Sequence, residues 1–426
     1  MKSSAPASVA TIVGLVLLST FLVAQNYPSN VRQKHYQVVA LGTLGGTISG
    51  ASSINNAGWI TGSSDLDGNL IQHATLWTPQ HTVDLGTLGG PNSAVGWPNH
   101  NDHGKIAGFA ETPDLDPLNE GWSCSHFFPQ PPTGHVCLGF VWQNNGRHGL
   151  PTLGGTNGYV TAMNNHDQVV GWAENTVHDS TCTLPQVLQF EAVVWGPNPG
   201  DMQQLQPYPG DPDTAATAIN DLGQVVGISG LCDIAFGGSS AIHPVLWDKG
   251  SVTYLGSFGG SVFNTAAGIN NAGTVVGWSD LTGDAVFHAF VWTQNSGMID
   301  IGTLDGDSYS LAYAINDRGQ VVGQSLDANF NSRAFLYENG KMHDLNKLVP
   351  PGSPTLTYAN DINSSGQITG GACTTCTGES IAFLAAPEQQ GDVSSLVGAS
   401  ETTRKGVLPE RIRQMIQQRH VMGRLN

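Results

Sequence analysis

The chain has 426 residues, of which only 12% are charged, while 54 are Gly and 23 are Pro. Such a composition is typical of short strands joined by many turns and excludes a mainly helical protein. The formal net charge is −17, and six of the 16 basic residues follow residue 400. The body of the chain is therefore strongly acidic and repels phosphate, so we expect no nucleic-acid partner.

The first 24 residues predict an export signal that is cleaved from the mature protein. Lys2 supplies a positive charge, residues 9–23 are apolar, and residues 22–24 offer a cleavage site before Gln25. A membrane anchor is the alternative, but the apolar run is short for a bilayer span and no charged stop follows it. We therefore expect a secreted protein, either extracellular or periplasmic.

One short phrase returns seven times after residue 54. It consists of an Asn, a Gly three residues later and a second Gly four residues beyond that. The anchoring asparagines are Asn55, Asn101, Asn164, Asn220, Asn270, Asn316 and Asn363. The second Gly is present in every copy, whereas Asp167 replaces the first Gly in copy three, and Asp tolerates a left-handed backbone. Spacings of 46 to 63 residues indicate a repeat architecture in which each copy is one structural unit.

The fifth copy predicts four antiparallel strands. Residues 264–269 and 274–279 form two strands around a turn in which Gly273 supplies the positive φ. A polar loop leads to a third strand at 288–292, and after another turn the fourth strand covers 298–304. Four short strands in so small a repeat are one propeller blade. A parallel β-helix is the alternative, but its coils are about half this length and lack hairpin turns.

The strand count predicts how the ring closes. Third strands occur seven times, and they end at Trp77, Trp142, Trp195, Trp247, Trp292, Tyr337 and near Leu384. Fourth strands also number seven, but the first one, at 36–44, precedes any complete blade, and the last blade lacks its own. We therefore predict an all-β, seven-bladed β-propeller of four-stranded blades over residues 35–387, in which the N-terminal strand pairs with the last blade. We expect the large rings that end the third strands to pack between blades.

These phrases resemble a known repeat family. The stretch Asp84-Leu85-Gly86-Thr87-Leu88-Gly89-Gly90, the Ile-Asn-x-x-Gly-x-Val-Val-Gly phrase and His288-Ala289-Phe290 are similar to the HAF-repeat family of predicted extracellular bacterial repeat proteins. The resemblance covers residues 36–386. The chain departs from the pattern at 204–207 and 344–348, and one copy alone carries the full tripeptide. The resemblance implies an extracellular setting and brings no catalytic residues to this chain.

Six cysteines in an exported chain predict disulfides. All six fall in loops between second and third strands, and they are Cys124, Cys137, Cys182, Cys232, Cys373 and Cys376. The first two share one insertion, the middle two occupy equivalent places in neighbouring repeats, and the last two form a C-x-x-C. A metal site or a redox C-x-x-C is the alternative, but the second ligand pair and the strand-to-helix context are missing from the sequence. The sequence leaves the connectivity open.

Long insertions in copies two and three, at 111–137 and 174–188, suggest a binding surface. Hairpin geometry places these loops on one face, together with the links between blades. The first insertion contains Trp122, Phe127 and Phe128 before a Pro-rich stretch, which suits a protein or carbohydrate ligand. Drift in a tolerated loop is the alternative. We expect a non-enzymatic binding or cell-surface interaction module, with a propeller hydrolase built from these loops and a purely structural extracellular component as alternatives.

The innermost strands argue against an enzyme. Ala stands at the same inner position in five copies, namely Ala51, Ala216, Ala266, Ala312 and Ala359. Asp361 is the ionisable residue that we find in these segments, whereas a propeller hydrolase needs positioned acids, bases and charge stabilisers around the axis. Small residues at these positions fit close packing of the strands.

The sequence predicts no cofactor, with Ca²⁺ as an open alternative. Asp65, Asp67 and Asn69 form an oxygen-rich loop, but such residues are ordinary in turns and the bidentate Glu of an EF-hand is missing. Three histidines begin third strands where another copy has Arg333, so this position is not a metal-ligand set.

The segment 388–426 departs from the repeats. Residues 389–400 predict a linker, and Pro409 opens a short, basic, amphipathic helix. This helix can contact an anionic membrane or a partner. It can equally dock on the acidic propeller, which the charges favour.

Overall fold

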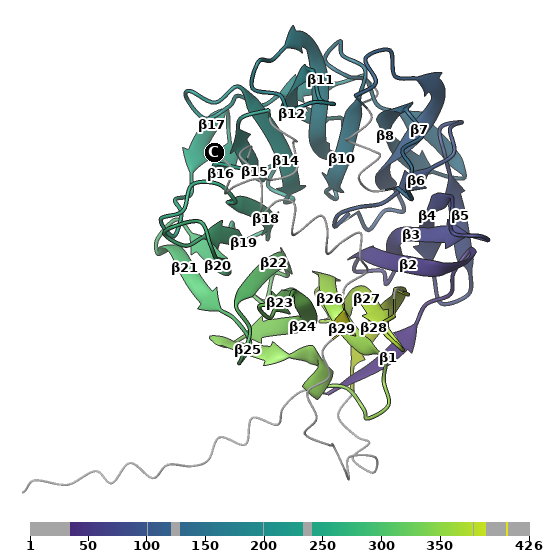
Figure 1. Ribbon diagram of the computed structural model, residues 1–426, viewed down its shortest axis with the longest axis vertical. Coiled ribbons are helices and arrows are strands. Elements are labelled where there is room, and N and C mark those ends of the chain that lie inside the picture. The colour runs from purple at the N-terminus through teal and green to yellow at the C-terminus, as the bar shows by residue number, and fades with distance from the viewer. Residues whose placement is uncertain are drawn as a thin grey trace, which may run out of the picture. The chain divides into compact units, whose positions relative to one another are not determined.

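The computed structural model describes residues 35–388, with gaps at 100, 121–127, 199, 233–240 and 378, together with 406–407. These residues form seven antiparallel sheets arranged as the blades of a ring (Figure 1). The one helix in these ranges is a short 3-10 turn, η1 (Leu345–Lys347), and none there has the length and apolarity of a membrane span. The predicted signal and the predicted C-terminal helix lie outside the described residues.

The strands of blades 1 to 6 follow one another in chain order from the axis outwards. Blade 1 contains β2 (Gly45–Ile54), β3 (Ile60–Leu66), β4 (Gln72–Trp77) and β5 (Thr82–Gly86). Blade 2 contains β6 (Ser93–Ala94), β7 (Ile106–Leu115), β8 (His135–Gln143) and β9 (Gly146–Gly149). Blade 3 contains β10 (Gly158–Met163), β11 (Val169–His178), β12 (Leu188–Trp195) and β13 (Met202–Gln204). Blade 4 contains β14 (Asp213–Ile219), β15 (Val225–Gly230), β16 (His243–Asp248) and β17 (Ser251–Tyr254).

Blades 5 and 6 continue this order, and blade 7 completes the ring. Blade 5 contains β18 (Thr265–Ile269), β19 (Val275–Asp280), β20 (Phe287–Thr293) and β21 (Gly297–Gly302). Blade 6 contains β22 (Tyr309–Ile315), β23 (Val321–Leu326), β24 (Asn331–Glu338) and β25 (Lys341–Asp344). Blade 7 contains β26 (Thr355–Ile362), β27 (Ile368–Cys373), β28 (Ile381–Pro387) and β1 (Tyr36–Ala40). A further short strand, β29 (Gly406–Val407), lies between the predicted linker and the predicted helix and pairs with the start of β24.

The ring closes through its N-terminal strand. β1 pairs antiparallel with β28, in a register that runs from Tyr36 opposite Pro387 to Ala40 opposite Phe383. Figure 1 shows the purple first strand beside the yellow-green end of the last blade. Blade 7 thus takes its outermost strand from the opposite end of the propeller sequence. The predicted seven-bladed fold and its mode of closure are confirmed.

The two glycines of the repeated phrase are required for different structural reasons. The first lies in the turn after the anchoring Asn and adopts a left-handed backbone, with φ of +75° at Gly273. Asp167 takes the same conformation, with φ of +60°, as its sequence position predicts. The second Gly faces a bulge in the first strand of its own blade, where a Cβ atom at Gly277 would lie 1.9 Å from the Thr265 carbonyl oxygen. A side chain at that position would collide with backbone.

The anchoring asparagines form a closed ring of hydrogen bonds around the axis. In each blade, Asn Oδ1 accepts backbone amides of its own turn, as Asn270 does from Ala272 and Thr274 at 3.1 and 3.0 Å. The Nδ2 group donates to the backbone carbonyl of the anchoring Asn in the next blade. Seven such bonds of 2.9 to 3.1 Å run in order through Asn55, Asn101, Asn164, Asn220, Asn270, Asn316 and Asn363 and return to Asn55. The repeated Asn therefore holds its own turn and ties each blade to its neighbour.

The core lies between the blades, in a series of apolar clusters. The Trp residues that end third strands are almost fully buried, and the cluster around Trp77 joins blade 1 to Ala382 and Leu384 of blade 7. The indole N–H of Trp77 also donates to the Gly42 carbonyl at 2.7 Å, in the link that enters blade 1. The five Ala residues at the inner position are fully buried. Both residue types pack between blades, as predicted.

The His and Arg residues that begin third strands contact carboxylates. The Nδ1 atom of His73 lies 2.9 Å from Asp84, that of His243 lies 2.7 Å from Asp211, and that of His288 lies 2.8 Å from Asp300. In blade 6, Arg333 takes the same place and contacts both Asp307 and Asp344, at 2.7 and 3.1 Å. The exchange of His for Arg between copies follows from this shared contact with a carboxylate.

Candidate functional site

Three adjacent blades carry the longest loops between second and third strands. These connections cover 116–134 in blade 2, 179–187 in blade 3 and 231–242 in blade 4, whereas blade 6 needs only 327–330. Because the second strand of each blade ends where the link from the preceding blade arrives, all these loops lie on the same face of the ring. Figure 1 shows blades 2 to 4 as consecutive blades, around β7, β11 and β15. We call the described residues of these three loops, 116–120, 128–134, 179–187, 231–232 and 241–242, the loop platform.

A buried glutamate joins the first two loops of the platform. Glu120, from the blade 2 loop, is 1% exposed, and its Oε1 accepts the backbone amides of Val187 and Leu188 at 2.9 and 2.6 Å. The side-chain amide of Gln186 lies between Glu120 and Glu174 and donates to them at 3.4 and 2.9 Å. The blade 2 loop is therefore bound to the end of the blade 3 loop across the seam between the blades.

Glu174 belongs to a position that recurs in the repeats, ten residues after the anchoring Asn. Its Oε2 accepts the backbone amide of Asn157 at 2.7 Å, at the start of blade 3. In blade 2, Glu111 accepts the backbone amide of Asn92 at 3.0 Å, and in blade 5 Asp280 accepts that of Phe263 at 2.8 Å. The carboxylate holds the entry of its own blade. Blade 3 differs because Glu120 brings a second carboxylate to Glu174.

Both carboxyl groups at this seam, those of Glu120 and Glu174, have raised pKa values. Burial raises the pKa of Glu174 to about 7, and the charge of Glu120 adds to the shift. Burial also raises the pKa of Glu120, and the nearby charge of Asp116 acts in the same direction. The hydrogen bonds from Val187 and Leu188 favour the charged form of Glu120. Glu174 is thus the member of the pair that holds a proton most readily near neutral pH.

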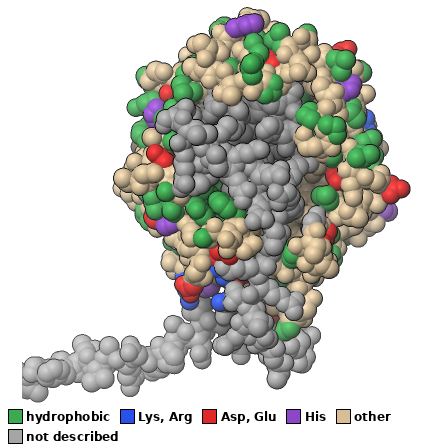
Figure 2. Space-filling model, in the orientation of Figure 1, with side chains coloured by type: hydrophobic (Ala, Val, Ile, Leu, Met, Phe, Trp, Pro, Cys, Tyr) green, Lys and Arg blue, Asp and Glu red, His purple; other side chains and the backbone are tan. Residues whose placement is uncertain are grey.

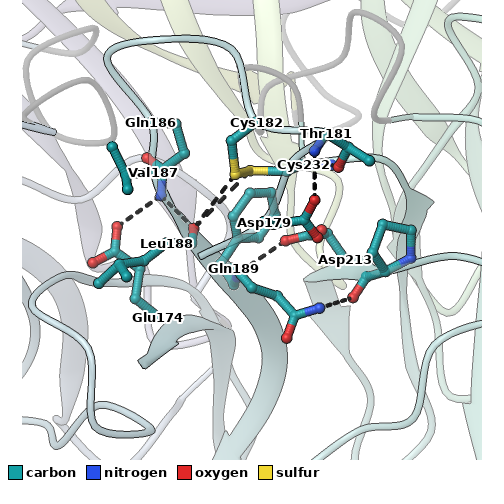
Figure 3. Close-up of a disulfide and its surroundings, with 12 residues drawn as sticks. Glu174, Asp179, Thr181, Cys182, Gln186, Val187, Leu188, Gln189, Asp213 and Cys232 are labelled. Carbon is teal, nitrogen blue, oxygen red and sulfur yellow. Dashed lines mark hydrogen bonds between the residues drawn. A yellow bond between two sulfur atoms is a disulfide. The ribbon is translucent and has the colours of Figure 1, made fainter. Parts of the chain in front are cut away.

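A disulfide joins the second and third loops of the platform. Cys182 and Cys232 are 50 residues apart in sequence and have Cα atoms 4.6 Å apart. The bond crosses from the blade 3 loop to the blade 4 loop (Figure 3). Thr181 strengthens the same seam, because its hydroxyl oxygen accepts the backbone amide of Cys232 at 3.0 Å. The three loops are therefore joined one to the next: Glu120 joins the blade 2 loop to the blade 3 loop, and this disulfide joins the blade 3 loop to the blade 4 loop.

A second carboxyl pair lies beside the disulfide. Asp213, at the start of β14, is 1% exposed, and its Oδ1 accepts the Phe190 amide at 2.8 Å. Its Oδ2 is buried and has no hydrogen-bond partner among the described residues. Burial raises the pKa of Asp213 to about 8, and the charges of Asp179 and Glu191 add to the shift. Figure 3 shows Asp179, which comes from the blade 3 loop, next to Asp213 beneath the disulfide.

The aromatic residues predicted to contact a ligand are only partly described. Phe128 is 1% exposed and packs on Phe109, with 5.5 Å between ring centroids. Its ring is part of the core beneath the platform and is closed to a surface ligand. Trp122 and Phe127 lie outside the described residues.

The predicted disulfide cysteines are also only partly described. Cys373, at the end of β27, forms a disulfide with Cys376 in the loop that follows, and Cys182 pairs with Cys232. Cys137 is also disulfide-bonded, while Cys124 lies outside the described residues.

The oxygen-rich loop of blade 1 binds backbone of its own blade. Asn69 Oδ1 accepts the amide of Thr47 at 2.8 Å, directly after the Gly-Gly turn that enters the blade. In blade 5, Asp284 does the same for Ser261 at 2.7 Å. Gly46 leaves no space for a side chain there, since a Cβ atom would lie 2.6 Å from Asn69 Oδ1. Within the described ranges, no three His, Cys, Asp or Glu side chains are grouped so that they could hold a metal ion.

On the opposite face, the axis opens through a ring of amides and carboxylates. The residues after the seven anchoring asparagines alternate in type, and they are Asn56, Asp102, Asn165, Asp221, Asn271, Asp317 and Ser364. Each Asp oxygen accepts from the preceding blade, as Asp102 does from the amide of Asn56 at 2.8 Å. They line a cavity of about 60 Å³. Sequence analysis missed these three axial carboxylates, although the alternation after each anchoring Asn is readable in the sequence.

The ionisable residue that was predicted near the axis, Asp361, binds two groups of the neighbouring blade. Asp361, in β26, is fully buried, and its Oδ2 accepts the backbone amide of Ile54 at 2.8 Å and the hydroxyl of Ser53 at 3.1 Å. Both donors belong to blade 1. Asp361 therefore joins blade 7 to blade 1 at the closure of the ring.

Figure 2 shows acidic and apolar side chains spread over one face of the molecule, with few Lys or Arg among the described residues. Four of the large apolar side chains that are exposed belong to the platform or to the strand ends beside it: Leu115, Leu118, Val177 and Leu184.

Comparison with known proteins adds only general similarity. No family model and no curated protein matches the chain. Solved structures that match include the β-propeller domain of the trilobed protease from Pyrococcus furiosus, at 8% identity and a TM-score of 0.44, covering 83% of this chain and 98% of that one. A gluconolactonase from Xanthomonas campestris matches at 9% identity and 0.38, covering 84% and 91%. A mutant lectin from Aleuria aurantia matches at 12% and 0.34, covering 74% and 99%. With these low TM-scores, none of them bears on function.

Proposed function

We propose that this chain is an exported, non-enzymatic binding module that contacts its ligand through the loop platform. The observation that carries the proposal is the joining of three long loops into one connected surface, by Glu120 at one seam and by Cys182–Cys232 at the other. Loops that had lengthened by drift alone would not need such bracing across blade boundaries. Fixing the loops beforehand reduces the entropy lost when a ligand binds.

The disulfides support a location outside the reducing cytosol, where such bonds persist. The exposed apolar side chains of the platform, Leu184 among them at 80% exposure, supply contact area that suits a protein or a carbohydrate. No cofactor is part of the proposal. The proposed ligand classes are therefore those that a rigid, half-apolar loop surface recognises by shape and by local polar contacts.

A non-enzymatic role is supported by the position of the unusual carboxyl groups. Glu174 and Asp213 have raised pKa values, but they are 0% and 1% exposed. Glu174 binds a backbone amide of its own blade, and Asp213 binds one of the preceding blade. A catalytic acid must reach the substrate, and these groups hold loops instead. The axial carboxylates, in turn, accept hydrogen bonds from neighbouring turns.

The test is a screen of the full chain against a glycan array and a panel of secreted proteins. A specific ligand should bind the oxidised protein and bind at least about tenfold more weakly to a Cys182→Ser/Cys232→Ser variant, because its loops lose one seam. A Cys373→Ser/Cys376→Ser variant, which alters a loop outside the platform, is the matched control and should bind normally. Equal binding by all three proteins would contradict the role of the platform, and turnover of a substrate by the purified chain would favour the hydrolase alternative.

A further inference from the structure

A carboxyl pair lies at each of the two seams of the loop platform, and three of the four members are buried while Asp179 is half-buried. At the first seam, Glu120 of the blade 2 loop lies near Glu174 of blade 3, with the Gln186 amide between them. At the second seam, Asp179 of the blade 3 loop lies near Asp213 of blade 4. Each pair therefore joins a loop to the blade that follows it. Two carboxylates in one buried site cannot both be charged without a large cost.

The surroundings of the pairs leave them without a compensating positive charge in the described part of the chain. The charge that acts on Glu174 is that of Glu120, and the charge that acts on Glu120 is that of Asp116. For Asp213 the acting charges are Asp179 and Glu191. The imidazole next to Asp179 in sequence, His178, is exposed. Neutral amides and backbone N–H groups supply the hydrogen bonds at both seams.

We propose that protons on Glu174 and Asp213 hold the loop platform closed on its blades, and that loss of these protons loosens both seams. When Glu174 is neutral, Glu120 can remain charged and keep its two bonds to the Val187 and Leu188 amides. When both are charged, they repel each other across the Gln186 amide. A proton on Asp213 likewise lets Oδ2, which is buried and unpaired among the described residues, donate towards Asp179.

The direction of the pH effect follows from linkage. A loop that has opened exposes its carboxyl groups to water, where the pKa of Glu returns to its ordinary value of 4.5 and that of Asp to 3.8. Closed loops therefore bind protons more tightly than open loops. Closure weakens as pH rises from about 4 towards the raised values, and it becomes independent of pH above them. The platform is thus held more tightly in an acidic setting than at neutral pH. As a regulation of the binding surface, this inference rests on the proposed function.

The test measures the loops directly and uses no ligand. Hydrogen exchange of the oxidised full chain is followed between pH 5.5 and 8, and rates are converted to protection factors so that the intrinsic effect of pH on exchange is removed. The amides of Val187 and Leu188 report on Glu120, and that of Phe190 reports on Asp213. We expect protection at these amides to fall by about tenfold or more over this range, while peptides of β22 and β23 in blade 6 keep theirs. Unchanged protection at all three amides would overturn the proposal.

Two variants assign the effect to its groups. Glu174→Gln should sharply reduce the pH dependence at Val187 and Leu188, where the burial of Glu120 leaves a remainder, and should leave that at Phe190 unchanged. Asp213→Asn should do the reverse. Glu111→Gln, at the equivalent position of blade 2, is the matched control and should leave both intact. Persistence of the full pH dependence in Glu174→Gln and Asp213→Asn would contradict the assignment. If either variant fails to fold, the pH series of the wild-type chain still decides. Because no ligand is used, protection that is high and unchanged at every pH refutes this inference without refuting the proposed function.

Discussion

Asn363 donates its side-chain amide to the backbone carbonyl of Asn55 at 3.1 Å, although 308 residues separate the two in sequence. This contact is the last of seven equivalent bonds, and it is the one that joins blade 7 to blade 1. β1 closes the same junction at the outer edge of blade 7. The ring is therefore closed twice, by a strand at its rim and by an amide near its axis.

Removal of the Asn363 amide should destabilise the propeller. Asn363→Asp keeps an acceptor for the turn amides and removes the donor to Asn55, leaving a buried carbonyl without its partner. We expect a loss of about 1–3 kcal/mol in the free energy of unfolding, measured by urea denaturation. Ser364→Ala, at the next and exposed position, is the control and should change the free energy by less than about 0.5 kcal/mol. Equal effects of the two variants would show that the axial ring is not stabilising.

The two disulfides that join described cysteines should differ in their contribution to stability. The Cys182–Cys232 bond closes 50 residues of chain, whereas Cys373–Cys376 closes three. On the chain-entropy model, replacing the first pair by Ala should cost about 4 kcal/mol and replacing the second about 2 kcal/mol. Thermal unfolding of both double variants, with and without a reducing agent, tests the order. A larger loss from the short loop would contradict this account.

Equivalent carboxylate contacts on third strands should differ in their contribution to stability because their burial differs. Arg333 and Asp307 are almost fully buried, with side chains 3% and 0% exposed, whereas the Asp300 side chain beside His288 is 40% exposed. Asp307→Asn should cost about 3–5 kcal/mol, since it leaves a buried guanidinium only partly compensated. Asp300→Asn should cost about 1 kcal/mol or less, because solvent screens that pair. Chemical denaturation at pH 7 provides both values, and equal losses would be inconsistent with the packing described.

The same half-exposed pair should give a weak acid dependence of stability. Burial alone would raise the pKa of Asp300, but hydrogen bonds from His288 and from the Gly302 amide lower it overall. A lowered carboxyl pKa stabilises the fold above the ordinary Asp value and loses this effect as pH falls through the lowered one. The stability of the wild-type chain should therefore approach that of Asp300→Asn below pH about 4. A gap between the two proteins that stays constant from pH 7 to pH 3 would disagree with this sign.

The sequence predicts the fold well because its repeat carries local rules with steric causes. The Gly at position 277 is required by a backbone oxygen 1.9 Å from its Cβ position, and the same requirement recurs in every blade, so the pattern survives at a fixed register. Closure was predictable for a different reason. The strand at 36–40 had no partner in its own repeat, and the last repeat lacked one strand.

The candidate site was predictable only in outline. Cysteine positions and loop lengths indicated one face of the ring, but Glu120 has no repeat equivalent to mark it. Its partners, the amides of Val187 and Leu188, lie 67 and 68 residues away. Phe128 has the composition of a ligand contact, yet it is buried against Phe109, which depends on how the insertion folds back. Contacts of this kind arise from the path of a loop in space and leave no period in the sequence.

The central claim is that the loop platform, and not the opposite face, receives the ligand. The chain offers a matched pair of surface variants for this test, because Leu184 lies in the blade 3 loop and is 80% exposed, while Leu222 lies at the axial turn of blade 4 and is 67% exposed. Affinities of the wild type, Leu184→Asp and Leu222→Asp are measured for a ligand found in the screen. We predict at least a tenfold loss of affinity for Leu184→Asp, equivalent to about 1.4 kcal/mol, and no change for Leu222→Asp. Normal binding by Leu184→Asp together with a loss in Leu222→Asp would contradict the account.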